Sequence, residues 1–449
     1  MITYQDMQKA LETGTKIADF IKGAIEKHKG TEEYAMAYVA DCYNKHRNLT
    51  IMQYQKFLYT ASGKAVPDDY SANYKLRTNV FNRLVRQQNQ FLLGNGVKWG
   101  KDEEKTKKAL GEDFDHQLQK AGENAIVHGE AFGFWNLDHV DIFSLLEFVP
   151  LLDEETGALM AGIRFWQLDS DKPLRATLYE IDGYTEYIWE KDQPSGRILI
   201  DKRSYIVKLK GTEADGMEIY EGENYPAFPI VPLWANEYKQ SEFVGMRENI
   251  DAYDLIKSGF CNNIDDASEV YWIIQNAGGM DEVDIAEFLH KIKTKHAANV
   301  DDDQKAEPNT INIPTEAREK ILDRLRADMI EDFMGLDTKN LASGAVTATQ
   351  IEAAYEPMNE KADGYEYCIT DFINRILALA KIEDIPSFTR SMIVNASENI
   401  QVVLQGAQYL SQDYVTEKIL TLLGDGDKAD EIIKEMDADD INRFGGNNE

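Results

Sequence analysis

Residues 243–274 read FVGMRENIDAYDLIKSGFCNNIDDASEVYWII, and their apolar side chains recur every three or four residues. A helix places side chains with this spacing on one face, where they can pack against other elements. The stretch therefore predicts one long helix. Its apolar positions are Phe243, Met246, Ile250, Tyr253, Ile256, Phe260, Ile264, Ala267, Tyr271 and Ile274.

A second, more regular stripe lies further along the chain. Its spacing alternates between four and three, which predicts a second long helix, and Pro357 predicts a kink near the start of that helix. Such a stripe is usual for any helix that packs on a core, so neither stripe alone indicates a function. The positions are Ile351, Tyr355, Met358, Ala362, Tyr365, Ile369, Phe372, Ile376 and Leu379.

Between the two stripes the sequence predicts a compact insert, a third helix and a loop. The third helix carries the narrow apolar stripe Ile321, Leu325, Met329 and Phe333. In order, these elements are a short helix at 283–292, an acidic turn at Asp301, Asp302 and Asp303, a strand at 310–313, a helix that opens after Pro314, and a loop of small and polar residues at 335–347.

The regions on either side differ in their pattern. Helical spacing dominates the first 60 residues and the segment from Asn79 to Gly94, with a loop predicted at 62–70. Residues 142–233 are rich in β-branched and aromatic residues separated by turn signals, which predicts a mostly antiparallel β region. Beyond Asn395 two or three short helices are expected, followed by an acidic tail.

Composition limits the class of protein. A chain of 449 residues is expected to form two or more domains. No apolar run reaches the roughly 18 residues of a membrane span, and the first 20 residues lack an apolar signal core. The three cysteines are far apart, which argues against a disulfide framework or a cysteine zinc site and fits a reducing compartment.

The net charge of −31 repels DNA phosphates over roughly a Debye length of 8–10 Å. Proteins that grip nucleic acid normally carry a basic patch instead. The charge is compatible with an ordinary solvated acidic surface, or with an acidic tunnel wall along which DNA slides without sticking. Composition does not choose between these two interpretations.

Motifs that carry chemistry are incomplete in this chain. Ser62-Gly63-Lys64 is followed by Ala65, so a Walker A motif is absent and a packaging ATPase is excluded. His128-Gly129-Glu130 resembles the first half of a zinc-deaminase signature, but the second half is missing. We therefore expect no catalytic residue, no cofactor and no resident metal ion, and a protein that is not an enzyme.

Several phrases in collinear order carry a resemblance to a known family. The most specific is Ile250-Asp251-Ala252-Tyr253-Asp254 with Ser258. The chain resembles the bacteriophage portal proteins, or head-to-tail connectors, in the form typical of siphophages of Gram-positive bacteria. Asn95 departs from the family's usual form of its phrase. The other phrases lie at 91–97, 125–134, 148–156, 229–236 and 406–424.

The resemblance implies an α+β, portal-type fold with a mixed α/β wing, a two-helix stem, a small α/β clip, a long kinked wing helix and a helical crown. It divides the chain into a wing at 1–240, a first stem helix at 241–277, a clip at 278–313, a second stem helix at 314–334, a tunnel loop at 335–347, the long wing helix at 348–394, and the crown with its acidic tail at 395–449.

The resemblance also implies a function. A ring of about twelve copies would form the DNA channel at one capsid vertex, for genome packaging, head–tail joining and DNA ejection. Channel residues would be those of the tunnel loop, namely Asp337, Lys339, Asn340, Ser343 and Gly344, and the clip would bind partners through Asp301, Asp302, Asp303 and Glu307. The expected partners are double-stranded DNA without sequence preference, the terminase large subunit, the head–tail adaptor, and the major capsid and scaffolding proteins. The expected location is the virion, with the host cytoplasm during assembly and no membrane.

Two other interpretations stay open at this point. One is an acidic oligomeric capsid-associated adaptor or scaffold without a DNA channel. The other is a hydrolase within the β region, which requires paired carboxylates with shifted pKa values in a cleft.

Overall fold

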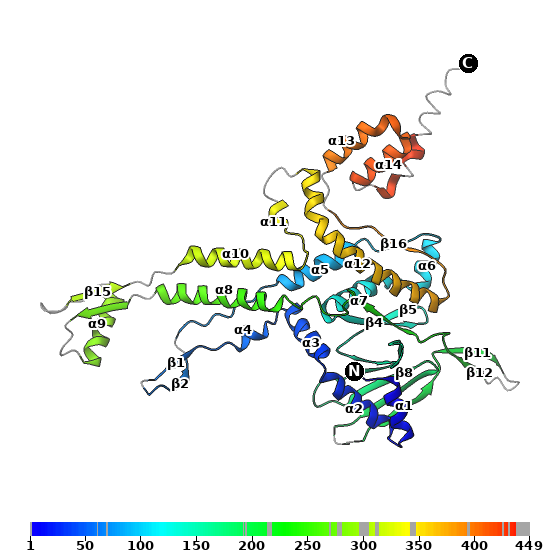
Figure 1. Cartoon of the computed structure of the whole chain (residues 1–449), viewed down its shortest axis with the longest axis horizontal. Helices are drawn as coiled ribbons and strands as arrows, with labels where there is room; N and C mark the ends of the chain where they lie inside the picture. Colours follow the sequence, from blue (N-terminus) through cyan, green and yellow to red (C-terminus); the bar gives the residue numbers. More distant parts are fainter. Residues whose placement is uncertain are drawn as a thin grey trace, which may run out of the picture. The chain divides into compact units, whose positions relative to one another are not determined.

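A computed structural model gives the fold of the chain (Figure 1). The chain forms two compact units, one comprising residues 1–45, 81–245 and 330–449 and the other residues 46–80 and 246–329. The structure describes residues 2–60, 62–68, 71–191, 193, 195–212, 218–268, 271–275, 281–295, 305–309, 314–341, 347–392, 396–423, 426–429 and 432–436.

The first unit combines helices with antiparallel sheets. Its helices are α1 (Tyr4–Glu12), α2 (Ile17–Lys29), α3 (Glu32–Asn44), α5 (Val80–Leu93), α6 (Glu103–Leu110), α7 (Phe114–His128), α11 (Thr338–Leu341), α12 (Ala348–Ala380), α13 (Ala396–Gly406) and α14 (Gln412–Leu423), with short 3₁₀ turns at Ala407–Tyr409 and Gly426–Lys428. Its strands are β3 (Val97–Trp99), β4 (Glu130–Asn136), β5 (His139–Ser144), β6 (Phe148–Leu152), β7 (Leu159–Trp166), β8 (Leu174–Glu180), β9 (Gly183–Trp189), β10 (Arg197–Arg203), β11 (Ile206–Thr212), β12 (Glu218–Glu223), β13 (Ile230–Trp234) and β16 (Pro386–Phe388).

Four sheets divide these strands. The largest has the order β10-β9-β8-β7-β6, and a three-stranded sheet has the order β13-β4-β5. Two ribbons, β11-β12 and β16-β3, complete the set, and every strand pair is antiparallel. The predicted antiparallel β region is therefore confirmed.

The apolar stripe of α12 packs against the three-stranded sheet. Phe372 is buried, and its ring lies where a Cβ at Gly133 of β4 would come within 2.5 Å of it. Gly122 of α7 makes similar room for Tyr365, whose hydroxyl donates a hydrogen bond of 2.9 Å to Asn89 Oδ1 of α5. A buried phenol hydroxyl needs a hydrogen-bond partner. Because Tyr365 finds this partner on α5, the hydrogen bond helps to define where α12 packs in this unit.

The predicted kinked helix is confirmed, but it ends at Ala380 and not at residue 394, because residues 386–388 form β16, which pairs with β3. The α12 helix runs through Pro357 and changes direction in Figure 1. The helices expected from the patterns in the N-terminal 60 residues and from Asn79 onward correspond to α2, α3 and α5. The predicted short C-terminal helices correspond to α13 and α14.

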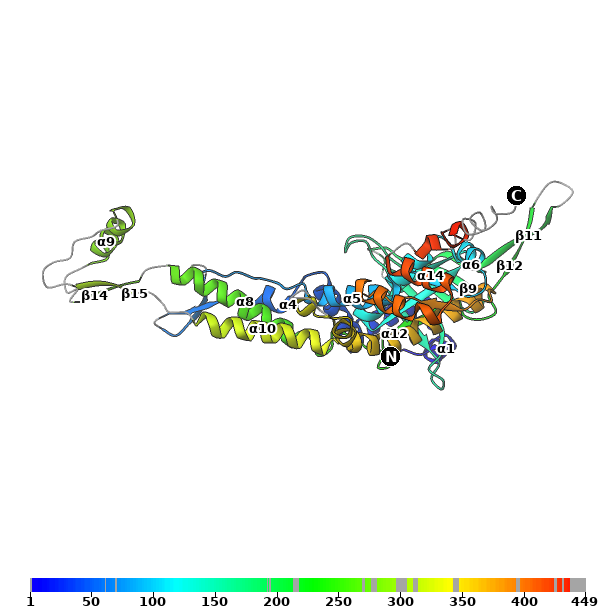
Figure 2. The ribbon, with the colours of Figure 1, turned by 90° about the horizontal axis from the view of Figure 1, so that it is seen from above.

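The second unit is built on two helices. Its elements are α4 (Leu49–Gln53), β1 (Phe57–Tyr59), β2 (Ala65–Pro67), α8 (Arg247–Ser268), β14 (Tyr271–Gln275), α9 (Glu282–Lys295), β15 (Lys305–Asn309) and α10 (Thr315–Asp332), whose last turn belongs to the first unit. The α8 and α10 helices lie side by side (Figures 1 and 2), and the Arg318 guanidinium lies 5.8 Å from the centre of the Phe260 ring.

Two predictions need correction here, and a third lies outside the described residues. The long helix predicted over 243–274 is shorter, because α8 ends at Ser268 and residues 271–275 form β14, which pairs with β15. The strand predicted at 310–313 lies outside the described residues, and the strand of the insert is β15. The loop predicted at 62–70 contains β2, which pairs with β1.

None of the helices within the described ranges has both the length and the hydropathy that a membrane span requires.

Candidate functional site

The helix α10 ends abruptly at the start of the predicted tunnel loop. Met334 adopts a left-handed backbone with φ of 58° and donates its N–H to Glu331 O at 2.8 Å, while Gly335 donates to Ile330 O at 2.8 Å. These two bonds form a Schellman motif, which satisfies the last carbonyls of a helix. A Cβ at Gly335 would lie 2.6 Å from Leu84 Cδ2. The chain therefore leaves α10 at a defined point, where a larger residue at position 335 would have to displace the Leu84 side chain.

The side chain of Gln87 holds the next residue of the loop. Its Nε2 donates to Leu336 O at 3.1 Å, and its Oε1 accepts from Leu336 N at 3.1 Å. The Leu336 side chain is buried with Phe91 and Tyr355. This pair of bonds imitates one step of a β ladder, so α5 fixes both the backbone and the side chain where the loop begins.

Replacement of Gln87 by alanine is expected to loosen the start of the loop. Two backbone groups of Leu336 would lose their partners, at a cost of about 1–2 kcal/mol. Amide hydrogen exchange at residues 336–341 should then accelerate by roughly tenfold. Gln90→Ala, on the same helix and exposed, is the control and should leave these residues unchanged. Equal exchange rates in the Gln87 variant and the wild type would contradict the assignment.

Of the predicted channel residues, Asp337 precedes a short helix, two lie within that helix, and two lie outside the described residues. The helix α11 contains Lys339 and Asn340, and Lys339 donates its N–H to Asp337 Oδ1 at 3.1 Å. The Lys339 side chain is exposed. Ser343 and Gly344 lie outside the described residues. A loop was predicted throughout 335–347. This prediction is wrong at 338–341, where the chain forms the helix α11.

Lys361 joins three segments that are distant in sequence. Its ammonium lies 2.8 Å from Glu242 Oε2, donates to Phe333 O at 2.8 Å and lies 3.5 Å from the centre of the Phe333 ring. The side chain is 13% exposed. Burial lowers the pKa of Lys361, and the Glu242 carboxylate acts in the opposite direction. Lys361 thus ties the segment that precedes α8 and the end of α10 to α12.

A row of polar side chains on α8 binds an extended segment of the chain in the second unit. Thr78 N donates to Asp254 Oδ1 at 2.8 Å, Leu76 N to Ser258 Oγ at 3.0 Å, and Tyr74 N to Asn262 Oδ1 at 2.7 Å. Four helical residues rise about 6 Å, close to the roughly 6.6 Å of two extended residues. Acceptors at every fourth helical position therefore match donors at every second extended position, as in a β ladder.

Asn48 completes this row of hydrogen bonds. Its Nδ2 donates to Asp254 Oδ2 at 2.8 Å, and its Oδ1 accepts from Ile51 N at 3.0 Å as the N-cap of α4. The Asp254 side chain is fully buried, and burial raises its pKa to about 6. The most specific phrase of the sequence lies at 250–258. Two of its residues, Asp254 and Ser258, therefore accept hydrogen bonds from the backbone of residues 74–78.

The predicted partner-binding residues of the clip are described only in part. Glu307 lies in β15 opposite Ile273 of β14. Asp301, Asp302 and Asp303 lie outside the described residues. Their role in binding partners stays a prediction.

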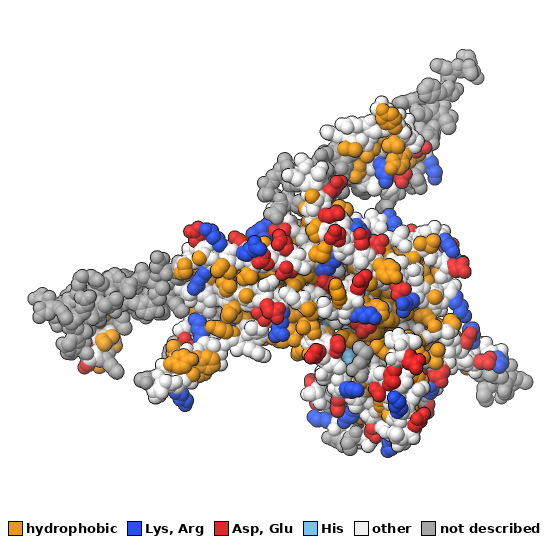
Figure 3. Space-filling model, in the orientation of Figure 1, with side chains coloured by type: hydrophobic (Ala, Val, Ile, Leu, Met, Phe, Trp, Pro, Cys, Tyr) orange, Lys and Arg blue, Asp and Glu red, His pale blue; other side chains and the backbone are white. Residues whose placement is uncertain are grey.

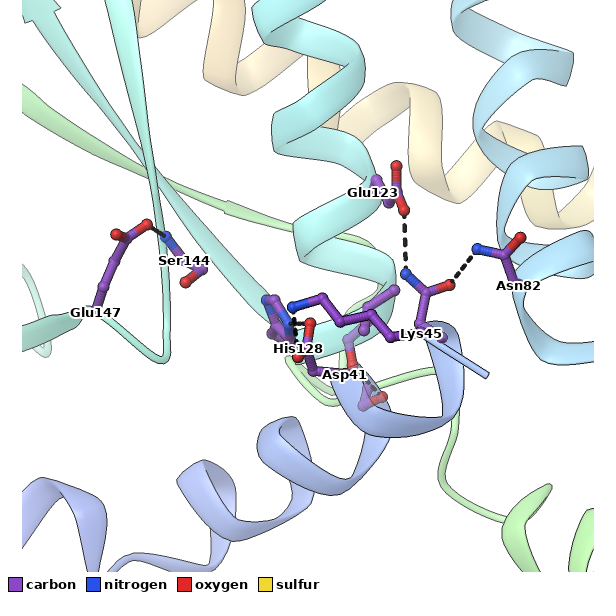
Figure 4. A network of polar contacts seen from close by, with 10 residues as sticks. Asp41, Lys45, Asn82, Glu123, His128, Ser144 and Glu147 are labelled. Carbon is purple, nitrogen blue, oxygen red and sulfur yellow. Dashed lines mark hydrogen bonds and ion pairs between the residues drawn. The ribbon is translucent and has the colours of Figure 1, made fainter. Parts of the chain in front are cut away.

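The histidine of the incomplete zinc motif belongs to a structural network (Figure 4). His128 Nε2 lies 3.4 Å from Asp41 Oδ1, and Lys45 Nζ donates to Asp41 Oδ2 at 2.8 Å. Burial alone would raise the pKa of Asp41, but the hydrogen bonds from His128 and Lys45 lower it on balance. Asn44 links Glu123 and Asn82, so the network joins α3, α5 and α7. Within the described ranges no group of three or more His, Cys, Asp or Glu residues could hold a metal ion.

A cavity of about 1110 Å³ opens in the first unit, and most of its lining is apolar. Glu130 lines it and accepts a hydrogen bond of 2.8 Å from the Trp234 indole, and Lys239 lies 4.0 Å from the centre of the Trp234 ring. Burial raises the pKa of Glu130 to about 7, while the indole and Lys239 act in the opposite direction. The partner of Glu130 is an indole and not a second carboxylate, unlike the pair that the hydrolase interpretation requires.

Glu130 makes the stability of the first unit depend on pH. Because its folded pKa of about 7 lies above the ordinary value of 4.5, stability is lost as pH rises from about 4.5 through 7. Glu130→Gln keeps the acceptor for Trp234 but cannot ionise. Relative to the wild type, its free energy of unfolding should rise by about 2 kcal/mol between pH 5 and pH 8, as measured by urea titration. Glu33→Gln, at an exposed position of the same cavity, is the control. A pH-independent difference for Glu130→Gln would refute this role.

The chain is similar to two curated portal proteins of phages. It is 27% identical to the portal protein of Clostridium phage phiCD119 over 223 residues, 45% of this chain and 47% of that protein. It is 22% identical to the portal protein of Bacillus phage SPP1 over 388 residues, 78% of this chain and 73% of that protein. The chain thus spans about half the length of the first relative and most of the second.

Solved structures of low identity are also similar. A chain of the neck of an empty gene transfer agent particle, computed with C6 symmetry, matches with a TM-score of 0.45 and 8% identity, covering 77% of this chain and 90% of that chain. A chain of the neck of the native particle, computed with C12 symmetry, matches with a TM-score of 0.43 and 9% identity, covering 76% and 89%.

The family described as phage portal protein, SPP1 Gp6-like, matches residues 29–442. Because the match covers most of the sequence, the chain belongs to this family of phage portal proteins. The predicted resemblance to phage portal proteins is thereby confirmed, and the two curated relatives are portal proteins of a Bacillus phage and a Clostridium phage. None of these comparisons supports the alternative of an adaptor or scaffold without a channel.

Proposed function

We propose that this chain is the subunit of a ring of about twelve copies at one capsid vertex, and that duplex DNA enters and leaves the capsid through the centre of the ring. The observation that carries the proposal is the family match over residues 29–442, which includes the whole succession of helix, insert, helix, loop and helix. The role is structural: the chain shapes and seals a channel, and other proteins supply the chemistry that moves DNA.

Electrostatics support a channel in which DNA slides. Tight phosphate contacts would stall translocation, so the channel should bind duplex weakly and without base contacts. The net charge of −31 favours this, and on the face seen in Figure 3 the Lys and Arg side chains are scattered among acids. The α12 helix alone carries six acids against two bases, Lys361 and Arg375.

The fixed ends of the predicted tunnel loop support a role at the narrowest part of the channel. Gln87 holds the loop where it starts, and Thr347 caps α12 where it ends, with its side chain accepting from Gln350 N. The proposed contacts with DNA lie between these two points. The clip is the proposed contact for the terminase large subunit and later for the head–tail adaptor, and the outer faces are the proposed contacts for the major capsid and scaffolding proteins. Assembly would take place in the host cytoplasm before the ring becomes part of the virion.

Electron microscopy of the purified chain, with mass from light scattering, tests the ring. We expect closed rings of about a dozen copies with a central hole wide enough for duplex DNA. If the chain stays monomeric, the experiment is repeated with the capsid and scaffolding proteins present. Compact particles without a hole under both conditions would overturn the proposal in favour of an adaptor.

Lys339 is the proposed point of transient contact with phosphate in the channel. Lys339→Ala should weaken DNA binding by the rings equally for all sequences, and the slope of log K against log salt should fall by roughly one for each phosphate that the variant no longer neutralises. Lys172→Ala, an exposed lysine of the β7–β8 connection, is the control. An unchanged slope for Lys339→Ala would remove Lys339 from the channel.

A further inference from the structure

The strands β11 and β12 form an isolated ribbon. Within the described residues each pairs only with the other, and the ribbon projects from the sheets of its unit (Figure 1). A two-stranded ribbon is marginally stable in water unless one of its faces packs against something. We refer to this ribbon, residues 206–212 and 218–223, as the arm.

The two faces of the arm differ. Lys208 and Lys210 pair with Glu223 and Glu221 across one face. The opposite face carries three apolar side chains with exposed fractions of 63%, 56% and 59%, which belong to Val207, Leu209 and Tyr220. An exposed apolar face beside a face of paired charges is typical of a surface that another protein covers.

Several contacts hold the root of the arm. Tyr205 is buried, and its hydroxyl donates to Glu180 O at 2.5 Å. Its N–H donates to Asn224 Oδ1 at 3.1 Å, and its ring lies 5.7 Å from that of Tyr225. These contacts fix the direction in which the arm leaves the sheets, so its apolar face is presented in one orientation.

The same unit contains a cavity that matches the arm in chemistry. The cavity of about 1110 Å³ is lined largely by apolar side chains, and Pro226, Ala227 and Phe228 form part of its wall directly after the arm ends. Ala227 is exposed at the rim. One chain therefore carries both the arm, with its exposed apolar face, and a largely apolar cavity.

We infer that, in the assembled ring, the apolar face of the arm of one subunit packs into the cavity of the neighbouring copy. This inference rests on the proposed ring. A contact between two different surfaces of the same chain is heterologous, and repetition of such a contact closes a ring. Each copy carries a net charge of −31, so two copies repel one another. The arm presents apolar side chains, and its lysines and glutamates are already paired with each other, so this contact does not increase the repulsion.

Cross-linking between two single-cysteine variants tests the inference. The full chain, with Cys42, Cys261 and Cys368 replaced by alanine, receives either Leu209→Cys on the arm or Ala227→Cys at the cavity, and a short bis-maleimide is the linker. A mixture of the two variants should yield a covalent dimer, each variant alone should not, and a chain that carries both cysteines should yield a ladder up to the full ring.

The outcomes separate the two proposals. Rings without a dimer in the mixture, or dimers from Leu209→Cys alone, overturn the arm contact and leave the ring intact. A dimer in the mixture without rings in the microscope, with the capsid and scaffolding proteins present as well as without them, keeps the arm contact and overturns the ring. The absence of both under these two conditions overturns both.

A second pair of variants measures the contribution of the contact. Leu209→Asp should raise the concentration needed for half assembly by at least tenfold while the melting temperature of the monomer stays unchanged. Leu168→Asp, which alters a leucine that is 89% exposed outside the arm, is the matched control and should assemble normally. Assembly of Leu209→Asp at the wild-type concentration would overturn the inference.

Discussion

Replacement of Asp254 by alanine is expected to lower the free energy of unfolding by about 3 kcal/mol, because a buried side-chain amide and a partly buried backbone N–H lose their acceptor at once. The donors are the backbone N–H of Thr78 and the side-chain amide of Asn48, each at 2.8 Å. The Asp254 side chain itself is fully buried. Urea unfolding measures the loss, and hydrogen exchange at Thr78 should accelerate most.

Two further variants distinguish the hydrogen bonds of Asp254 from a general effect on α8. Asp254→Asn keeps the shape but offers one acceptor oxygen for two donors, so about half of the loss is expected. Glu248→Gln, at an exposed position of the same helix, should change the free energy of unfolding by less than about 1 kcal/mol. If Asp254→Ala matched Glu248→Gln, the row of hydrogen bonds would not stabilise this unit.

The apolar spacing in the sequence predicted the helices well where a helix packs one face on a core. It predicted α10 and α12 nearly to their ends. It was wrong at 271–275, because Tyr271 and Ile274 continue the helical spacing although this stretch pairs with β15. The pairing depends on residues 305–309, which are distant in sequence, so local spacing could not reveal it.

The residues that hold distant segments together within each unit were harder to predict, since their roles are polar. The phrase at 250–258 was recognised, but its physical reason was not visible. Asp254, Ser258 and Asn262 are polar residues at steps of four, and a search for such a row of short polar side chains could have found them. The donors that they bind are backbone N–H groups of residues 74–78. Nearly every residue carries such a group, so the sequence could not show which ones are bound.

Lys361 was missed for a different reason. It lies between Met358 and Ala362 of the apolar stripe, where a lysine reads as the solvated border of a helix. Its partners Glu242 and Phe333 come from segments that only the fold brings together. Nothing in the local sequence distinguishes this buried lysine from an exposed one such as Lys320.

Replacement of Lys361 by methionine is expected to cost about 3–5 kcal/mol, because it leaves the Glu242 carboxylate largely buried without its counter-charge. Methionine retains the length of the side chain, so packing against Phe333 changes little. Phe333 O also loses a donor at the end of α10. The loss should appear in urea unfolding, and hydrogen exchange should accelerate at residues 334–341, because the same contacts fix the point where the predicted tunnel loop begins.

A double variant shows whether the cost comes from the unpaired charge or from poorer packing. If it comes from the charge, Lys361→Met with Glu242→Gln should recover at least half of the loss, since the amide can still accept from Asn236 Nδ2 without a buried charge. Arg375→Met, which breaks an exposed pair with Asp371 on the same helix, should cost less than about 1 kcal/mol. A double variant no more stable than Lys361→Met would place the cost in packing.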